Sequence, residues 1–132
     1  MTDGEIIAAR ARRCVGARFR PQGRNFAEGF DCIGVAAAAL GLGEVRSNYR
    51  LRGGSAEELF HELQATRMRR VETIESGDVL VMRAGPEQLH VGVATDLGFV
   101  HAHAGLEQVV ETPGSPEWPV LAICRLQPGE GV

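Results

Sequence analysis

The sequence predicts an α+β domain in which helices come first and an antiparallel sheet follows. Apolar residues recur at helical spacing in the first half of the chain, and they alternate with a period of two in the second half. The length of 132 residues is typical of one domain, so we expect residues 1–132 to enclose a single core. No internal repeat or linker interrupts this pattern.

Two outer helices are expected, at residues 3–14 and at residues 55–66. The first pattern places a partial apolar face opposite several arginines, and Gly16 follows its end. The second opens with Ser55-Ala-Glu-Glu, a capping-box sequence that satisfies free N–H groups at a helix start. His61 lies between apolar residues of this second pattern, so we interpret it as structural.

A further helix, at residues 32–40, is expected to be central and buried. Asp31 occupies the N-cap position immediately before it, and Gly41 follows its end. Its run of alanines favours helix and is small enough for close packing on nearly every side. The loop that precedes it, residues 17–30, is too long to be an idle connection in a small domain.

Five short strands follow, with tight turns between most of them. They are predicted at residues 78–83, 90–95, 98–103, 106–111 and 120–125. Because closely spaced strands usually pair in antiparallel fashion, we expect a five-stranded antiparallel sheet against which the helices pack. Trp118 lies just before the last strand, and we interpret it as a packing anchor, with a ligand platform as the alternative.

Composition excludes several classes of function. The 44% of hydrophobic residues is ordinary for a globular protein, and the net charge of −3 gives no reason to expect a nucleic-acid partner. All fourteen basic residues are Arg, which excludes chemistry that needs a lysine. The longest apolar run, residues 35–40, is far shorter than the roughly 20 residues of a membrane span. We therefore expect no membrane span.

The charges are unevenly distributed along the chain. Residues 1–70 hold twelve arginines against eight acidic residues, and residues 71–132 hold two against nine. One interpretation is that the two halves of the domain attract each other. The other is an electropositive surface that faces an anionic polymer. Its arginines would be Arg10, Arg12, Arg13, Arg18, Arg20 and Arg24.

The N-terminus and the cysteines bear on the cellular compartment. The acidic opening Met-Thr-Asp-Gly-Glu leads into an arginine-rich helix, the reverse of a secretory signal. We expect synthesis in the cytoplasm without a signal peptide, with particle association or release as the route to any site of action outside the cell. Cys14, Cys32 and Cys124 are too widely spaced for a disulfide framework or a structural zinc site. We interpret one thiol as functional and the other two as core residues.

Cys32 and the histidines of the predicted strands suggest nucleophilic catalysis. A helix start supplies partial positive charge that favours a thiolate, and Cys32 stands there. His90 and His101 belong to adjacent predicted strands, where residues on one face lie about 5 Å apart. One imidazole can therefore orient the other. The alternatives are a small buried cysteine with structural histidines, or a zinc site with unusual ligand spacing.

Five short motifs occur in order along the chain. They are Gly16-Ala-Arg-Phe19-Arg, Asp31-Cys32-x-Gly34, Gly77-Asp78-Val-Leu, His90-Val-Gly-Val and Gly98-Phe-Val-His101-Ala. Together they resemble the NlpC/P60 family of papain-like cysteine peptidases, over about residues 5–126. The segment 109–118 looks most like the branch of phage tail modules and gene transfer agents. The resemblance implies a papain-like fold with the nucleophile at the start of the central helix.

The resemblance also implies an activity and its residues. It is that of a cysteine endopeptidase cutting peptidoglycan stem peptides, typically beside γ-D-glutamate. Cys32 would be the nucleophile, His90 the general base and acid, and His101 the residue that orients His90. Asp31 would help to position the substrate amine, and the backbone N–H of Cys32 would contribute to an oxyanion hole. No metal or organic cofactor is implied. Besides the peptidoglycan peptide, phage-tail-like or other particle proteins are candidate partners.

Two further positions assigned to substrate binding depart from the family pattern. Phe19 stands where the family usually has Tyr, and Ile33 stands where it usually has Ser, so two polar groups are missing. His103 shares a face with His101 and has three interpretations: an alternative orienting residue, a lining of the substrate cleft, or a solvent-facing side chain. These departures motivate a rival function, a non-catalytic wall- or particle-binding module on the same fold. An amidase or acyltransferase on the same scaffold is a further alternative, because acyl-thiol chemistry does not fix the acceptor.

Overall fold

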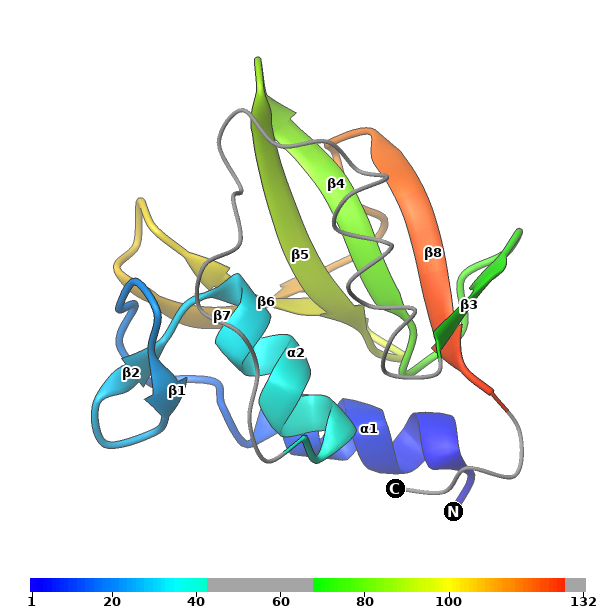
Figure 1. Ribbon diagram of the computed structural model, residues 1–132, viewed down its shortest axis with the longest axis horizontal. Coiled ribbons are helices and arrows are strands. Elements are labelled where there is room, and N and C mark those ends of the chain that lie inside the picture. Colours follow the sequence, from blue (N-terminus) through cyan, green and yellow to red (C-terminus); the bar gives the residue numbers. More distant parts are fainter. Residues whose placement is uncertain (43–67, 128–132) are drawn as a thin grey trace.

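The structure is a computed structural model that describes residues 1–42 and 68–127 (Figure 1). Its helices are α1 (Asp3–Arg12) and α2 (Cys32–Leu40). Its strands are β1 (Arg24–Asn25), β2 (Gly29–Phe30), β3 (Met68–Val71), β4 (Val79–Gly85), β5 (Gln88–Ala94), β6 (Gly98–His103), β7 (Gln108–Pro113) and β8 (Val120–Leu126). The α+β class is therefore confirmed. The predicted helix at 55–66, with His61, lies outside the described residues.

The main sheet has six strands in the order β3-β8-β4-β5-β6-β7, and every neighbouring pair is antiparallel. The prediction of five strands was wrong because it missed β3. This strand reads Met-Arg-Arg-Val and lies at the edge of the sheet, where Arg69 and Arg70 are exposed. An edge strand can carry charged residues, so it lacks the alternation of a half-buried strand.

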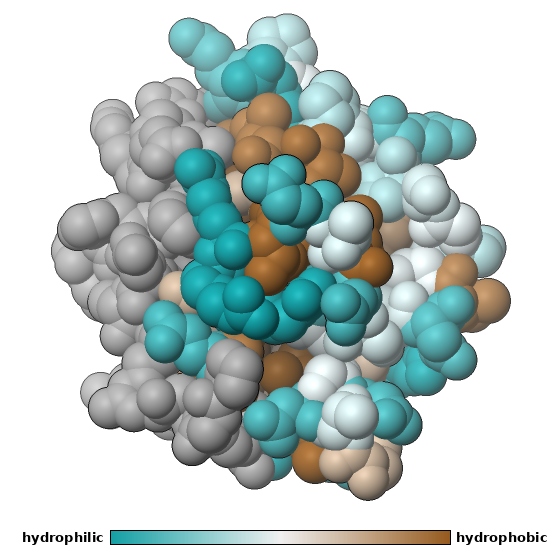
Figure 2. Space-filling view, turned by 90° about the vertical axis from the view of Figure 1, so that its right-hand side faces the viewer, coloured by the Kyte–Doolittle hydropathy of each residue, from teal (hydrophilic) through white to brown (hydrophobic). Residues whose placement is uncertain are grey.

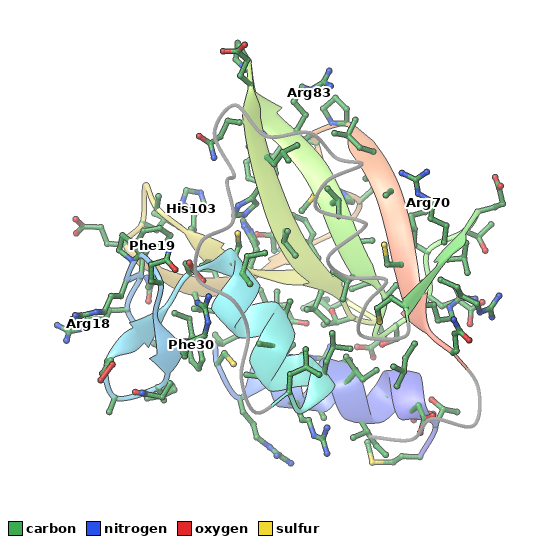
Figure 3. All side chains as sticks on the ribbon, in the orientation of Figure 1. Arg18, Phe19, Phe30, Arg70, Arg83 and His103 are labelled. Carbon is green, nitrogen blue, oxygen red and sulfur yellow. The ribbon has the colours of Figure 1, made fainter. Side chains whose placement is uncertain are left out.

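Charged side chains mark this edge of the molecule. Arg70 projects outward beside β8 (Figure 3). On the face that contains this edge, hydrophilic residues border an apolar area near the middle of the face (Figure 2). Charges of this kind discourage pairing between the edges of two sheets.

Both helices lie on one side of the sheet, with α2 packed against β5 and β6 and α1 packed against α2 (Figure 1). The main core forms between these layers and includes Ala36, Val91 and Val100. A smaller apolar cluster lies on the opposite face of the sheet, where Phe99 and Met82 meet Trp118. Trp118 thus packs against the sheet, as the packing-anchor interpretation requires.

The loop 17–30 joins the start of α2 to the edge strand β7. The backbone N–H of Val109 donates to the carbonyl oxygen of Ala17, and that of Phe19 donates to the carbonyl oxygen of Glu107. The same loop contains the short hairpin β1–β2, which the sequence analysis did not predict. Two-residue strands are too short to show any apolar period. The loop therefore fixes the segment before Cys32 against the turn between β6 and β7.

Oppositely charged residues of the two halves meet on the surface. Arg12 of α1 forms ion pairs with Asp96 and with Glu111. This contact agrees with the interpretation that the two halves attract each other. None of the helices in the described part of the chain is long and apolar enough to cross a membrane.

Candidate active site

The start of α2 is fixed by the carboxylate of Asp31. Its Oδ1 accepts a hydrogen bond from the backbone N–H of Gly34 at 2.8 Å, and its Oδ2 accepts one from Gln22 at 2.9 Å. A guanidinium nitrogen of Arg24 donates to the same carboxylate at 3.0 Å. The bond to Gly34 confirms the N-cap prediction. Asp31 is 5% exposed, so this cap is buried.

The Asp31-Cys32-x-Gly34 motif ends in glycine for a steric reason. A Cβ atom at this position would lie 2.1 Å from the carbonyl oxygen of Gly23. No side chain fits at that distance, because the backbone of the loop passes directly over the first turn of the helix. The close approach brings the loop against the helix end that carries Cys32.

Cys32 is the first residue of α2, and 3% of its surface is exposed. Its thiol lies near the backbone N–H of Val91, the residue that follows His90 on β5. Burial, and after it the charge of Asp31, raise the pKa of Cys32 to about 12, although the nearby backbone N–H groups act in the opposite direction. Cys32 alone is therefore a neutral thiol at neutral pH.

This differs from the expectation of a readily formed thiolate. That expectation considered the partial charge at the helix start, which favours the anion. The sequence did not show how completely the thiol is buried or that its N-cap neighbour is a buried carboxylate. Ionisation of Cys32 consequently needs a base that takes up its proton.

His90 and His101 are in direct contact. Their Nε2 and Nδ1 atoms lie 2.9 Å apart, and the two rings meet edge to face. Strands β5 and β6 pair at Val93↔Val100 and Ala94↔Phe99 and then diverge (Figure 1). The two histidines span the opening between the diverging strands. With His101 on its Nε2, His90 has Nδ1 left for a reaction partner.

Aromatic rings surround the two histidines on the face of the sheet opposite α1. Phe99 stacks on His101 with ring centroids 4.5 Å apart, and Trp118 meets His90 and His101 edge to face at 5.1 Å and 5.7 Å. This burial lowers the pKa of His90 to about 4 and that of His101 to about 3, and neighbouring histidines add to both shifts. Both rings are neutral at pH 7.

His103 is held by the turn that follows β6. Its Nδ1 accepts a hydrogen bond from the backbone N–H of Leu106 at 3.0 Å, and its ring lies 5.6 Å from that of His101. Figure 3 shows its side chain above the start of α2, in the same region as Phe19. In this structure the histidine bonded to His90 is His101, and His103 stands beside the pair.

The two positions that depart from the family pattern lie in different surroundings. Phe19 is half-buried against the main core, and its backbone N–H donates to Glu107 at 2.9 Å. Ile33 is 6% exposed and belongs to the main core. A contact of either side chain with substrate stays a prediction.

Sequence reasoning missed Thr112, whose hydroxyl lies 2.8 Å from Nε2 of His101. It stands on β7 opposite Phe99, and is thus the diagonal neighbour of His101 across the strand pair. The available signal was a hydroxyl residue one position beyond a predicted strand, which is too common to indicate a site. No group of three or more ligand-type side chains suited to a metal occurs within residues 1–42 and 68–127.

Comparison with solved structures shows which fold this arrangement belongs to. The peptidoglycan hydrolase RipB from Mycobacterium tuberculosis superposes with a TM-score of 0.61 and 22% identity, covering 94% of this chain and 64% of that one. The NlpC/P60 domain of the peptidoglycan hydrolase SagA superposes with a TM-score of 0.57 and 23% identity, covering 85% and 90%. The chain has the NlpC/P60 fold.

The likeness is one of structure. No protein-family model matches the sequence, and no curated protein matches it either. The chain spans 64% of the length of the RipB structure. Within the NlpC/P60 fold, this chain places a buried cysteine at the start of α2 and a bonded histidine pair on β5 and β6.

Proposed function

We propose that this protein is a cysteine endopeptidase that hydrolyses peptidoglycan stem peptides, with cleavage beside γ-D-glutamate. The observation that carries the proposal is the bond of 2.9 Å between Nε2 of His90 and Nδ1 of His101, where the residue after His90 on its strand, Val91, has its backbone N–H near the thiol of Cys32. Nucleophile, base and orienting group are the parts that acyl transfer through a thiol requires. The two solved structures compared above are peptidoglycan hydrolases, which suggests the substrate class.

In the proposed mechanism, Nδ1 of His90 takes the proton of the Cys32 thiol while Sγ attacks the scissile carbonyl carbon. The backbone N–H of Cys32 helps to stabilise the oxyanion that forms. The C–N bond then breaks as His90 gives its proton to the leaving amine, and a thioester remains on Cys32. Water attacks the thioester carbonyl while Nδ1 of His90 takes one of its protons. The C–S bond then breaks, His90 returns the proton to Sγ, and the acid product and the free thiol of Cys32 are released.

The electrostatics of the pair fit this sequence of steps. Burial favours the neutral thiol and the neutral imidazole before substrate binds. Proton transfer creates both charges together, and their mutual attraction offsets part of the cost of burying each one. In this mechanism, the carboxylate of Asp31 is the proposed contact for an amine of the substrate.

Incubation with purified peptidoglycan, followed by mass spectrometry of the soluble products, tests this proposal. The wild type should release peptides with new termini beside γ-D-glutamate, and Cys32→Ala should release none. Cys14→Ala is the matched control, because it also removes a buried cysteine, one that lies in the core beyond α1. Hydrolysis by a folded Cys32→Ala protein would overturn the assignment of the nucleophile.

One observation favours a second candidate, a wall- or particle-binding module without catalysis. With 3% of its surface exposed, the Cys32 thiol offers substrate little access. This candidate predicts that the protein sediments with insoluble peptidoglycan regardless of Cys32 and releases no product.

An amidase or acyltransferase would instead form a thioester on Cys32 that an acceptor other than water resolves. The resemblance to the phage-tail branch further suggests association with a particle that delivers the protein to the wall.

A further inference from the structure

Thr112 closes a chain of hydrogen bonds that begins at His90. Nε2 of His90 lies 2.9 Å from Nδ1 of His101, and Nε2 of His101 lies 2.8 Å from Oγ1 of Thr112. His101 is 1% exposed, so its ring nitrogens depend on these two partners rather than on water. The position of one proton in this chain therefore determines the positions of the others.

The proposed chemistry permits one arrangement of these protons. For Nδ1 of His90 to take a proton, Nε2 of His90 must already carry one and donate it to His101. Nδ1 of His101 is then the acceptor, so the proton of His101 resides on its Nε2 and is donated to Thr112. The reverse arrangement would place the proton of neutral His90 on Nδ1, where it would prevent His90 from acting as a base.

The demand on Thr112 is greatest when His90 is charged. A protonated His90 carries a hydrogen on both ring nitrogens, so its Nε2 can only donate to His101. His101 must then donate from its Nε2 to Oγ1 of Thr112, which is the last acceptor in this series of hydrogen bonds. Hydrogen bonds aligned in this way polarise one another and stabilise the positive charge on His90.

We propose that Thr112 is a positioning residue that keeps His101 in the tautomer with its proton on Nε2, and so keeps Nδ1 of His90 free to accept the proton of Cys32. This inference rests on the proposed function for its catalytic consequence. The chain of bonds is given by the three side chains, and the direction of its protons follows from the proposed chemistry. Thr112 does not touch the thiol, and it acts through His101.

Two substitutions separate this role from a purely structural one. Thr112→Val keeps the shape of the side chain and removes the acceptor, whereas Thr112→Ser keeps the hydroxyl. Thr95→Val is the control for the loss of a hydroxyl: Thr95 donates to Glu111 at 2.6 Å within the network of Arg12, apart from the histidines. All three variants are compared as full chains, with folding checked by urea unfolding.

Nitrogen NMR of histidine-labelled protein reads the tautomers directly, because a ring nitrogen with a proton and one without differ in chemical shift. The proposal predicts a proton on Nε2 of both His90 and His101 in the wild type and in Thr95→Val. Thr112→Val should give a mixture of His101 tautomers, and Thr112→Ser should restore the single one. A wild-type His101 with its proton on Nδ1 would overturn the proposal.

Peptide hydrolysis supplies the second readout. Thr112→Val should lower kcat roughly tenfold with KM unchanged, the size expected when one buried hydrogen bond is lost in the charged state. Thr112→Ser should recover most of that loss. Wild-type rates in Thr112→Val would refute the catalytic role. If the wild type itself hydrolyses nothing, the proposed function fails, and the nitrogen shifts alone then decide the tautomer assignment.

Discussion

Nε2 of His90 and Nδ1 of His101 lie 2.9 Å apart at a point where their two strands have already separated. Backbone pairing therefore does not hold them together, and the contact depends on the side chains themselves. The contact leaves Nδ1 as the nitrogen of His90 that accepts the proton of Cys32 in the proposed mechanism. The geometry leads to predictions for both rings.

Replacement of His101 tests its role as the orienting residue. His101→Ala leaves Nε2 of His90 without its acceptor in a buried site, so kcat/KM should fall roughly 10- to 100-fold. His101→Asn offers an amide oxygen at a similar distance and should retain more activity than His101→Ala. Steady-state kinetics on a stem-peptide substrate provide the measurement. Equal activity of His101→Ala and the wild type would remove His101 from the mechanism.

Acidification should destabilise the fold through the same two rings. Burial lowers the pKa of His90 to about 4 and that of His101 to about 3, both below the ordinary 6.5 of an unfolded histidine. As the pH falls below 6.5, the two histidines bind protons in the unfolded chain but stay neutral in the folded chain. The free energy of unfolding should then fall by up to about 2.7 kcal/mol per pH unit between roughly pH 6 and pH 4.

Urea unfolding at a series of pH values measures this slope. His101→Asn removes one of the two titrating rings, so its slope in the same window should be about half that of the wild type. Carboxylates with lowered pKa values, such as Asp96, contribute only nearer to their own ordinary range at more acidic pH. A flat wild-type profile between pH 6 and pH 4 would show that the histidines are not buried as described.

Trp118 should control the acid limit of activity. Its ring lies edge to face on His90 at 5.1 Å, and burial is the main cause of the low pKa of His90. Trp118→Ala opens this face to water, so the pKa should rise and the acid limb of kcat/KM should move from near pH 4 toward pH 6.5. Trp118→Phe keeps an aromatic cover and serves as the matched control. An acid limb that stays in place in Trp118→Ala would contradict this account.

Asp31 should affect stability and the thiol separately. Asp31→Ala removes the N-cap and leaves Gly34, Gln22 and the guanidinium of Arg24 without this acceptor, which should cost roughly 2–4 kcal/mol of unfolding free energy. Asp31→Asn keeps a capping oxygen and removes the charge that raises the pKa of Cys32. It should therefore lower that pKa and speed alkylation at a given pH. Urea unfolding and labelling rates distinguish the two effects.

Most of the fold could be predicted because its elements have local signals. Asp31, the alanine run and Gly41 delimit α2 as expected, and the alternating residues of β4 to β6 mark their strands. Strand β3 and the hairpin β1–β2 have no such signal. Strand β3 pairs with a partner distant in the chain, as Met68 does with Leu126, and the strands of the hairpin are only two residues long.

The site could be predicted only in part. Alternation places His101 and His103 on the same face of one strand, so it cannot select between them as the partner of His90. The selection depends on how β5 and β6 diverge and on the turn in which Leu106 binds His103. Thr112 and the burial of Cys32 likewise arise from tertiary packing, which no spacing of residues along the chain reveals.

The most direct test of the central claim is the alkylation rate of Cys32 in the wild type and in His90→Ala, from pH 4 to pH 10, read by peptide mass spectrometry. If His90 takes the thiol proton, the wild-type rate should level off between about pH 5 and pH 8. In His90→Ala the thiol is alone, with a pKa near 12, and its rate should rise about tenfold per pH unit throughout. The buried Cys14 and Cys124 should stay unlabelled. Identical pH profiles for the two proteins would show that His90 does not act on Cys32.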